Sequence, residues 1–468
     1  MQQSDHLSVP GAPLIERWPL LHPVTWVFAT LPFQWMPGAG GVTVPYLFVM
    51  LAMGALCLAP RAIIGMTWVL RSAAIWLVPY LVYLMILFVS LSASAEQGMA
   101  TRQAFFLAAF VTVAAWLATA QTPARLLRWW AGGMILSFLL VSETIARSLG
   151  LSWVDAYTRF YINGDLGFIV YGFLREIFIA SAGASDAFVP ASQKNMVSGA
   201  LFLALLMFRA GYMRSDRDTT GLIVTVLLVS LLIMLNTRIV LVSLVLGGVV
   251  VWLIRFSSGQ NFSLGGLLLR VFVVLFAGLA LLAFLGSDSA IASTLSERFL
   301  FEDHSTGSRL SQYAWALQQI EQSFFTGSGY GELSGQPVHN IFLGAFMHAG
   351  VFAFLLVLFF YGVTLAIWAG FVLRLVREPQ DWVLPLRGEW VAVLPMLPLL
   401  RMWVSGDAGH HSIVEWAAMA VFIGLLASNE ALRPALERGR ASRRTASGTR
   451  PDRPVEASDD VLYPQKIQ

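Results

Sequence analysis

Apolar residues run along this chain in long blocks, separated by short polar segments. Blocks of about 18 to 22 residues with few charges are long enough for a helix to cross a hydrocarbon layer about 30 Å thick. The pattern predicts an all-α fold, a polytopic integral membrane protein with about twelve transmembrane helices and a small helical periplasmic loop domain. The expected spans are residues 19–36, 42–59, 73–92, 103–120, 129–147, 195–213, 219–236, 238–254, 267–286, 341–373, 389–405 and 411–428.

Two of these spans depart from a simple crossing. Pro19, Pro23 and Pro32 interrupt the first one, and proline breaks the helical hydrogen-bond ladder. The segment 341–373 is too long for one straight helix, so we expect a tilted or interfacial turn before Gly350.

Composition agrees with a membrane protein. Of the 468 residues, 57% are hydrophobic and only 12% are charged, which no soluble domain of this size matches. The single cysteine, Cys57, lies inside an apolar block and cannot form an intramolecular disulfide. Residues 1–18 are polar, so we interpret them as a cytoplasmic leader and not as a signal peptide. We expect a lipid bilayer, and no nucleic acid, as partner.

Positive charge sets the expected orientation. Most Lys and Arg residues, including Arg61, Arg125 and Arg255, fall at one set of span ends or in the tail. Because cytoplasmic loops are rich in these residues, both termini are expected in the cytoplasm. The connections 148–194 and 287–340 then face outward, the first within spans one to nine (19–286) and the second as a loop subdomain before spans ten to twelve (341–428). Residues 429–468 are expected to form a disordered basic tail.

Candidate chemistry begins where the second outer connection meets span ten. "GQPVHNIFLGAFMHAG" places His339 and Asn340 after a polar stretch whose glycines and proline favour tight turns. Such turns hold the imidazole at one depth relative to the bilayer. Asn340 either caps the following helix or orients the imidazole ring.

Cations on the outer side are the next candidates, because a charge near lipid needs an anion or water. Arg238 lies in the short break between spans seven and eight, where it either snorkels to lipid phosphate or binds a substrate anion. Arg309 is the second residue of "SRLSQYAWALQQIEQSFF", an amphipathic pattern that predicts a helix with Arg309 in its first turn. Arg175 and Lys194 add charge to an aromatic outer segment, which is either an interfacial belt or a sugar-stacking platform.

Several other motifs are excluded. "GSGYGE" resembles a phosphate-binding loop, but no strand precedes it and no Lys-Ser or Lys-Thr pair follows. The chain has neither CxxC nor HExxH, so neither a metal nor another cofactor is expected.

Four segments in order resemble the superfamily of O-antigen polymerases and O-antigen ligases of bacterial envelopes. They are "SQKNMVSGALFLALL", "LNTRIVLVSLVLGG", "TGSRLSQYAWALQQIEQSFFTGSGYG" and "HNIFLGAFMHAGVFAFLL", which span about residues 192 to 365. The resemblance implies a metal-independent glycosyltransferase of the inner membrane that uses an undecaprenyl-pyrophosphate-linked glycan as donor. The acceptor is a second glycan in a polymerase, and lipid A core or a protein in a ligase.

The resemblance also implies roles for single residues. His339 matches the family's catalytic histidine, and Arg238 matches an arginine that binds the pyrophosphate; Arg309 and Arg175 are further candidates for that anion. Lys194 stands where the family often has proline, and Asn340 supports the histidine. The alternatives from other classes are a transporter or flippase of lipid-linked glycans and a noncatalytic scaffold that docks a partner.

Overall fold

The computed structural model describes residues 18–33, 44–91, 97–148, 152–162, 192–212, 219–235, 237–257, 304–329, 338, 340–404 and 413–448, and every regular element in these ranges is helical. The α-helices are α2 (Pro23–Thr30), α3 (Val44–Cys57), α4 (Pro60–Leu91), α5 (Gln97–Ala118), α6 (Pro123–Ser148), α7 (Trp153–Tyr161), α9 (Ser192–Gly211), α10 (Thr219–Leu235), α11 (Arg238–Ser257), α14 (His304–Gln322), α15 (Ile341–Arg377), α16 (Gly388–Val391), α17 (Met396–Val404) and α18 (Ile413–Gly448). Short 3-10 helices cover Pro19–Leu21, Leu31–Phe33 and Pro379–Asp381.

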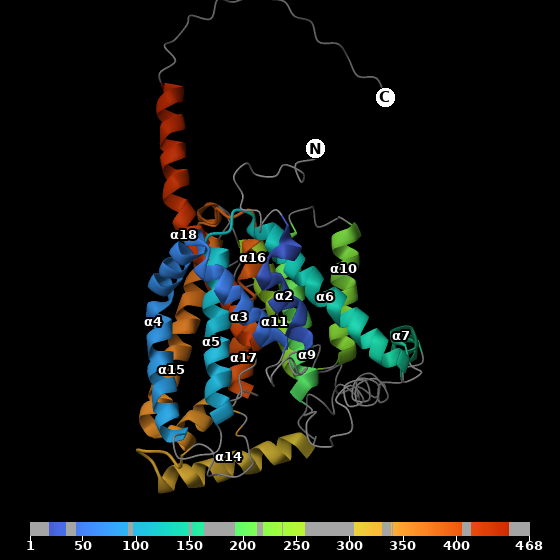
Figure 1. Cartoon of the computed structure of the whole chain (residues 1–468), viewed down its shortest axis with the longest axis vertical. Helices are drawn as coiled ribbons and strands as arrows, with labels where there is room; N and C mark the ends of the chain where they lie inside the picture. Colours follow the sequence, from blue (N-terminus) through green and yellow to red (C-terminus); the bar gives the residue numbers. More distant parts are fainter. Residues whose placement is uncertain are drawn as a thin grey trace, which may run out of the picture.

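The long helices form one bundle, and α14 lies across one end of it (Figure 1). Helices α4, α5, α15 and α18 pack side by side, while α2, α3, α6 and α9 form the neighbouring part. The second half of α18 projects from the opposite end of the bundle. We call the two ends the α14 end and the α18 end.

Helix α18 is deeply buried in the bundle. The apolar window within residues 413–431 is 89% buried, whereas the corresponding windows of α11 and α15 are 33% and 28% buried. Close packing depends on small residues: a Cβ on Gly424 would stand 2.8 Å from the carbonyl oxygen of Ala114 on α5. Glycine at this contact lets the two backbones approach, as in membrane helix packing.

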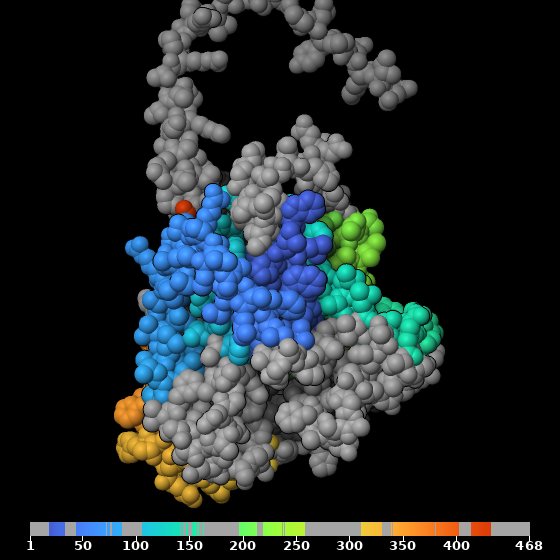
Figure 2. Space-filling model, viewed as in Figure 1, coloured from blue at the N-terminus to red at the C-terminus, as the bar shows by residue number. Residues whose placement is uncertain are grey.

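Several helices are apolar and long enough to cross a membrane. In the described part of the chain, three qualify by length and composition, namely residues 239–257, 341–377 and 413–431. A fourth span results if α3 and the start of α4, bent by 105°, count as one broken span. Helices α3 and α4 form much of the blue part of the surface in Figure 2. These helices and the turn between them carry many exposed apolar side chains, as a lipid-facing surface does. They are Met50, Leu51, Met53, Leu58, Ile63, Ile64, Trp68, Leu70, Val78, Val82 and Met85.

The predicted and observed helices agree in part. In its described part, residues 19–33, expected span 19–36 holds the eight-residue α2 between two 3-10 turns. Span 389–405 is divided into α16 and α17 by a turn. Prolines explain both interruptions, since Pro32 lies in the turn after α2 and Pro395 in the turn before α17. Span 267–286 lies outside the described residues. Twelve spans therefore remain a prediction.

The segment after Ala431 differs from expectation. Helix α18 continues to Gly448, where the sequence led us to expect a disordered tail. The sequence "ALERGRASRR" in this segment is rich in Ala, Leu, Glu and Arg, which have high helix propensity, and this accounts for the extension. The remainder of the expected tail, 449–468, lies outside the described residues.

Candidate functional site

Helix α15 is sharply kinked at Gly350, whose φ of 77° and ψ of −174° are not helical. The rings of Phe346 and Phe354 stack at 5.2 Å, and those of Phe342 and Tyr361 meet at 5.2 Å. Residues 342 and 361 would be about 28 Å apart in a straight helix. The first segment, 341–349, is therefore folded back along the second, which confirms a break at the predicted position.

The turn after α14 satisfies the backbone groups that the kink leaves open. The N–H groups of Ser328 and Gly329 donate to the carbonyls of Met347 (2.8 Å) and His348 (3.2 Å), and Val351 N–H donates to the Phe324 carbonyl (3.0 Å). Buried backbone groups need such partners, so the turn and the kink require each other. The "GSG" stretch, excluded above as a phosphate loop, thus holds α15 in its folded-back shape.

Asn340 caps α15. Its side-chain oxygen accepts hydrogen bonds from the N–H groups of Phe342 (2.9 Å) and Leu343 (3.1 Å), which confirms the capping alternative for this residue. His339 precedes it directly but lies outside the described residues. Because segment 341–349 is folded back, the capped end of α15 lies beside Tyr361.

The start of α11 is fixed by a buried pair of hydroxyl groups. Ser198 Oγ on α9 and Thr237 Oγ1 share a hydrogen bond of 2.6 Å. The carbonyl of Thr237 accepts from the N–H groups of Val240 and Leu241, so this residue begins α11 immediately before Arg238. Lys194 lies four residues before Ser198, hence on the same face of α9. The predicted cations Arg238 and Lys194 therefore stem from neighbouring helix ends.

A buried ion pair that was not predicted from the sequence lies beside these helix ends. Arg401 Nε, in the last turn of α17, lies 2.8 Å from Glu415 Oε1, in the first turn of α18. Both side chains are buried, with exposed fractions of 7% and 2%. One signal was available, because Glu415 is the lone charge in expected span 411–428 and Arg401 is the only cation in expected span 389–405, and such charges pair or serve a function.

Further contacts connect the start of α15, next to His339, with the start of α11 at Arg238. The Tyr361 hydroxyl, next to the start of α15, donates to the Leu399 carbonyl (3.1 Å) on α17, two residues before Arg401. On the other side, Arg401 Nη1 lies against α9, 3.7 Å from where a Cβ of Gly199 would be, beside Ser198. A continuous series of packed groups thus leads from the start of α15 to the start of α11.

The structure describes the backbone, but not the side chains, of most other predicted site residues. Arg309 lies in the second turn of α14, because this helix begins at His304 and not near residue 309 as expected. The side chains of Arg238, Arg309 and Lys194 lie outside the described part of the structure, and so does the whole of Arg175. The apolar stripe expected on α14 is buried only in part. Ile320 packs with Ala316, Val338 and Met347, and Tyr313 packs against this cluster, whereas Leu310, Leu317 and Phe324 are exposed.

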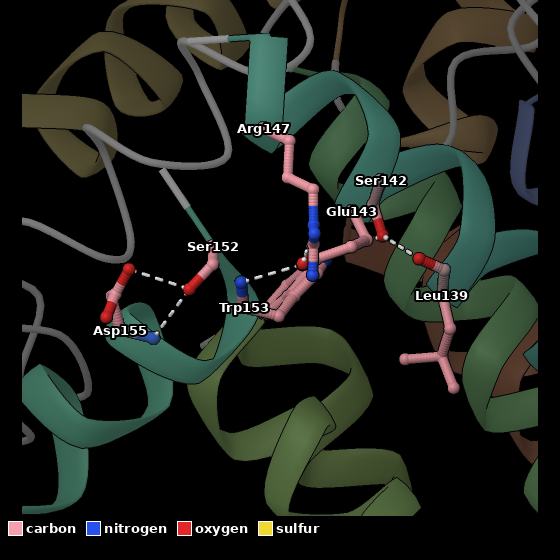
Figure 3. Close-up of polar contacts among 7 residues, drawn as sticks. All are labelled: Leu139, Ser142, Glu143, Arg147, Ser152, Trp153 and Asp155. Atoms are coloured by element: carbon pink, nitrogen blue, oxygen red, sulfur yellow. Dashed lines mark hydrogen bonds and ion pairs between the residues drawn. The ribbon is translucent and has the colours of Figure 1, made fainter. Parts of the chain in front are cut away.

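The aromatic segment that we expect on the outer side begins with a hydrogen-bonded corner between α6 and α7 (Figure 3). The Glu143 carboxylate accepts from the N–H of Trp153 (2.9 Å) and from Arg147 Nε (2.7 Å). Ser152 caps α7 by accepting from the N–H of Asp155 (3.1 Å). Exposed apolar side chains on and just after α7 are Val154, Tyr157 and Ile162. Together these contacts fix a short amphipathic helix, which fits the interfacial alternative.

Metal chemistry has no visible basis in the described residues, where no group of three or more His, Cys, Asp or Glu side chains is placed to hold an ion. Comparison of the whole chain with models of known families and with curated proteins finds no match.

Proposed function

We propose that this chain is a metal-independent glycosyltransferase of the bacterial inner membrane, with about twelve spans and both termini in the cytoplasm. Its donor is an undecaprenyl-pyrophosphate-linked glycan, and its acceptor is a sugar hydroxyl on the periplasmic face. The observation that carries the proposal is the fold-back of α15, with the ring contact between Phe342 and Tyr361. This contact supports a site in which the residue before Asn340 faces the helix ends of α9 and α11.

The proposed reaction needs one base and one anion site. The acceptor hydroxyl oxygen attacks the anomeric carbon of the donor, the bond from that carbon to the pyrophosphate oxygen breaks, and His339 takes the hydroxyl proton. An ordinary histidine has a pKa of about 6.5 and is largely neutral near pH 7. A positioned base of this kind contributes about 100 to 10,000-fold to the rate. Undecaprenyl pyrophosphate leaves as an anion and requires no general acid.

Arginine suits the leaving group because its planar guanidinium binds two phosphate oxygens at once and stays charged. Arg238 is proposed to bind the pyrophosphate, with Arg309, Arg175 or Lys194 as further cations. The N-terminus of α11, where Arg238 stands, adds the favourable end of a helix dipole for an anion. This combination stabilises the departing charge without a metal ion.

Polymerisation of O-antigen or exopolysaccharide repeat units is our first choice among the acceptor classes, on general likeness to the family. Ligation to lipid A core or to a protein uses the same donor chemistry. A transporter of lipid-linked glycans is the alternative from another class. Transporters are commonly built from two related halves, whereas the two long connections expected in this chain are unequal.

Purified protein in nanodiscs tests the proposal with a defined undecaprenyl-pyrophosphate oligosaccharide. Products are separated with and without added lipid A core. Longer lipid-linked chains indicate a polymerase, and glycosylated lipid A core indicates a ligase. His339→Ala should abolish transfer while the protein still inserts and folds. Transfer by this variant at the wild-type rate would remove His339 as the base, and movement of donor across the bilayer without product would favour a transporter.

A further inference from the structure

We infer that the Arg401–Glu415 ion pair is a positioning element of the donor site, which holds the start of α11 and the start of α15 at a fixed separation. The inference rests on the proposed function and goes beyond it, because neither residue belongs to the predicted site. Three features of the pair support it.

The first feature is burial. Both side chains are almost inaccessible, and the described ends of α17 and α18 meet at this contact. Two well-packed apolar side chains often stabilise a protein as much as a buried ion pair does, since charges lose hydration on burial. A pair at this depth therefore serves geometry better than stability. The charges also suit their helices, with the cation at the C-terminal end of α17 and the anion at the N-terminal end of α18.

The second feature is the contact of Arg401 with α9. Gly199 leaves room for the guanidinium, and Leu397 and Val414 approach the same glycine at 3.5 Å from its Cβ position. The adjacent residue, Ser198, holds Thr237 through the 2.6 Å hydrogen bond. A shift of Arg401 would therefore be transmitted through α9 to the first turn of α11, where the backbone of Arg238 begins.

The third feature is the attachment of α17 to α15. Tyr361 donates to the Leu399 carbonyl, half a turn from Arg401, and its ring contacts Phe342 in the first turn of α15. Helix α17 thus contacts α15 directly, and through Arg401 it contacts α9, which holds the start of α11. Glu415 fixes the rotation of α17, because Arg401 is held through Nε and points in one direction.

A second ion pair, at the C-terminal end of α11, offers a matched control. Arg255 Nη2 in the last turn of α11 lies 3.1 Å from Glu389 Oε1 on α16. This pair also joins two helices, but its side chains are 34% and 19% exposed, and it lies at the opposite end of α11 from Arg238. If ion pairs between helices matter only for stability, both pairs should behave alike in a transfer assay.

The experiment compares wild type, Arg401→Met/Glu415→Leu and Arg255→Met/Glu389→Leu in nanodiscs. Melting temperature and steady-state transfer from the undecaprenyl-pyrophosphate oligosaccharide are measured for each. Removing both charges together avoids an unpaired buried charge, so we expect the Arg401 double variant to keep its melting temperature. We expect its kcat/KM to fall about tenfold to a hundredfold, mainly through donor KM, because displacement of a binding group by about 1 Å has effects of this size. The control should stay within about twofold of wild type.

The outcomes separate the two proposals. An Arg401 double variant with wild-type KM and melting temperature overturns the positioning role and leaves the glycosyltransferase intact. A wild-type protein that forms no product with any acceptor overturns the proposed function itself. If the double variant does not fold, Arg401→Lys decides in its place, because it keeps the charge but loses the Nε contact. A tenfold rise in donor KM for Arg401→Lys supports the inference, and an unchanged KM overturns it.

Discussion

Gly350 stands directly against the backbone of Phe325, so closely that a Cβ at residue 350 would lie 2.1 Å from the Phe325 carbonyl oxygen. The relationship is mutual, because a Cβ at Gly327 would lie 2.4 Å from the backbone nitrogen of Ala349. Both glycines have positive φ, 77° and 71°, a region that other L-residues rarely adopt. The fold-back of α15 therefore depends on glycine at two positions for two reasons, backbone conformation and contact distance.

Replacement of Gly350 by alanine should open this fold-back. The positive φ alone costs about 1 to 3 kcal/mol in an L-residue, and the clash with Phe325 adds to it. We expect a lower melting temperature in detergent and loss of transfer activity, because the start of α15 moves. Gly362→Ala is the control, on the same helix with no atom within 4 Å of its Cβ position. Equal melting temperatures for the two variants would show that the kink is not needed for stability.

Asn340 offers a test that separates capping from catalysis. Asn340→Ala removes the acceptor for two backbone N–H groups and should cost about 0.5 to 2 kcal/mol of stability. Asn340→Asp keeps an acceptor and should retain the wild-type melting temperature. If Asn340 acts only as a cap, the aspartate variant also retains transfer activity. A stable but inactive aspartate variant would instead favour an additional role in orienting the His339 ring.

Tyr361→Phe tests the contact between α15 and α17 with minimal change in shape. The hydroxyl donates to the Leu399 carbonyl, and loss of such a bond costs about 0.5 to 1.5 kcal/mol. We expect a modest decrease in melting temperature and a larger decrease in kcat/KM, since α17 also carries Arg401. Thermal unfolding and transfer kinetics of one preparation measure both. A change in stability without any change in kinetics would argue against α17 as a connection between the two ends.

Local features of this fold could be predicted from the sequence, whereas its long-range pairs could not. The break at Gly350 and the cap at Asn340 depend on residues close together in the chain, and both are confirmed. The apolar stripe expected on α14 is buried only in part, since Leu310 and Leu317 are exposed. The start of α14 at His304 was missed, because "HSTGS" lacks the apolar periodicity that marked the rest of the helix. Boundaries of this kind are the least reliable part of a prediction from pattern.

The same contrast between local features and long-range pairs applies to the candidate site. His339 and Arg238 were chosen because each stands at the junction of a polar and an apolar segment, which periodicity alone reveals. Arg401 and Glu415 were missed because their partnership is visible only when two expected spans are placed side by side. No feature of the sequence indicated the hydrogen bond between Ser198 and Thr237, since hydroxyl side chains in apolar helices most often bond within their own helix.

Arg238→Lys tests whether the proposed anion site needs a planar guanidinium. Lysine keeps the charge but offers a single point of contact, so we expect transfer to fall by about tenfold to a hundredfold. Arg255→Lys, at the far end of α11, is the control and should remain near wild type. Near-normal transfer by Arg238→Lys would show that one positive charge suffices, and two-point binding of the pyrophosphate would then be wrong.

The hydroxyl pair between α9 and α11 is best tested by a double-mutant cycle of Ser198→Ala and Thr237→Ala. Each single change leaves the other hydroxyl buried without its partner, and the coupling energy should be about 1 kcal/mol in unfolding measurements. Thr225→Ala on α10 is the control, because the Thr225 hydroxyl donates to the carbonyl of Gly221 in its own helix. If the pair sets the depth of Arg238, both single variants raise donor KM and the double variant raises it no further. Additive effects on KM would show that the two hydroxyls act independently, and the start of α11 would then be fixed by packing alone.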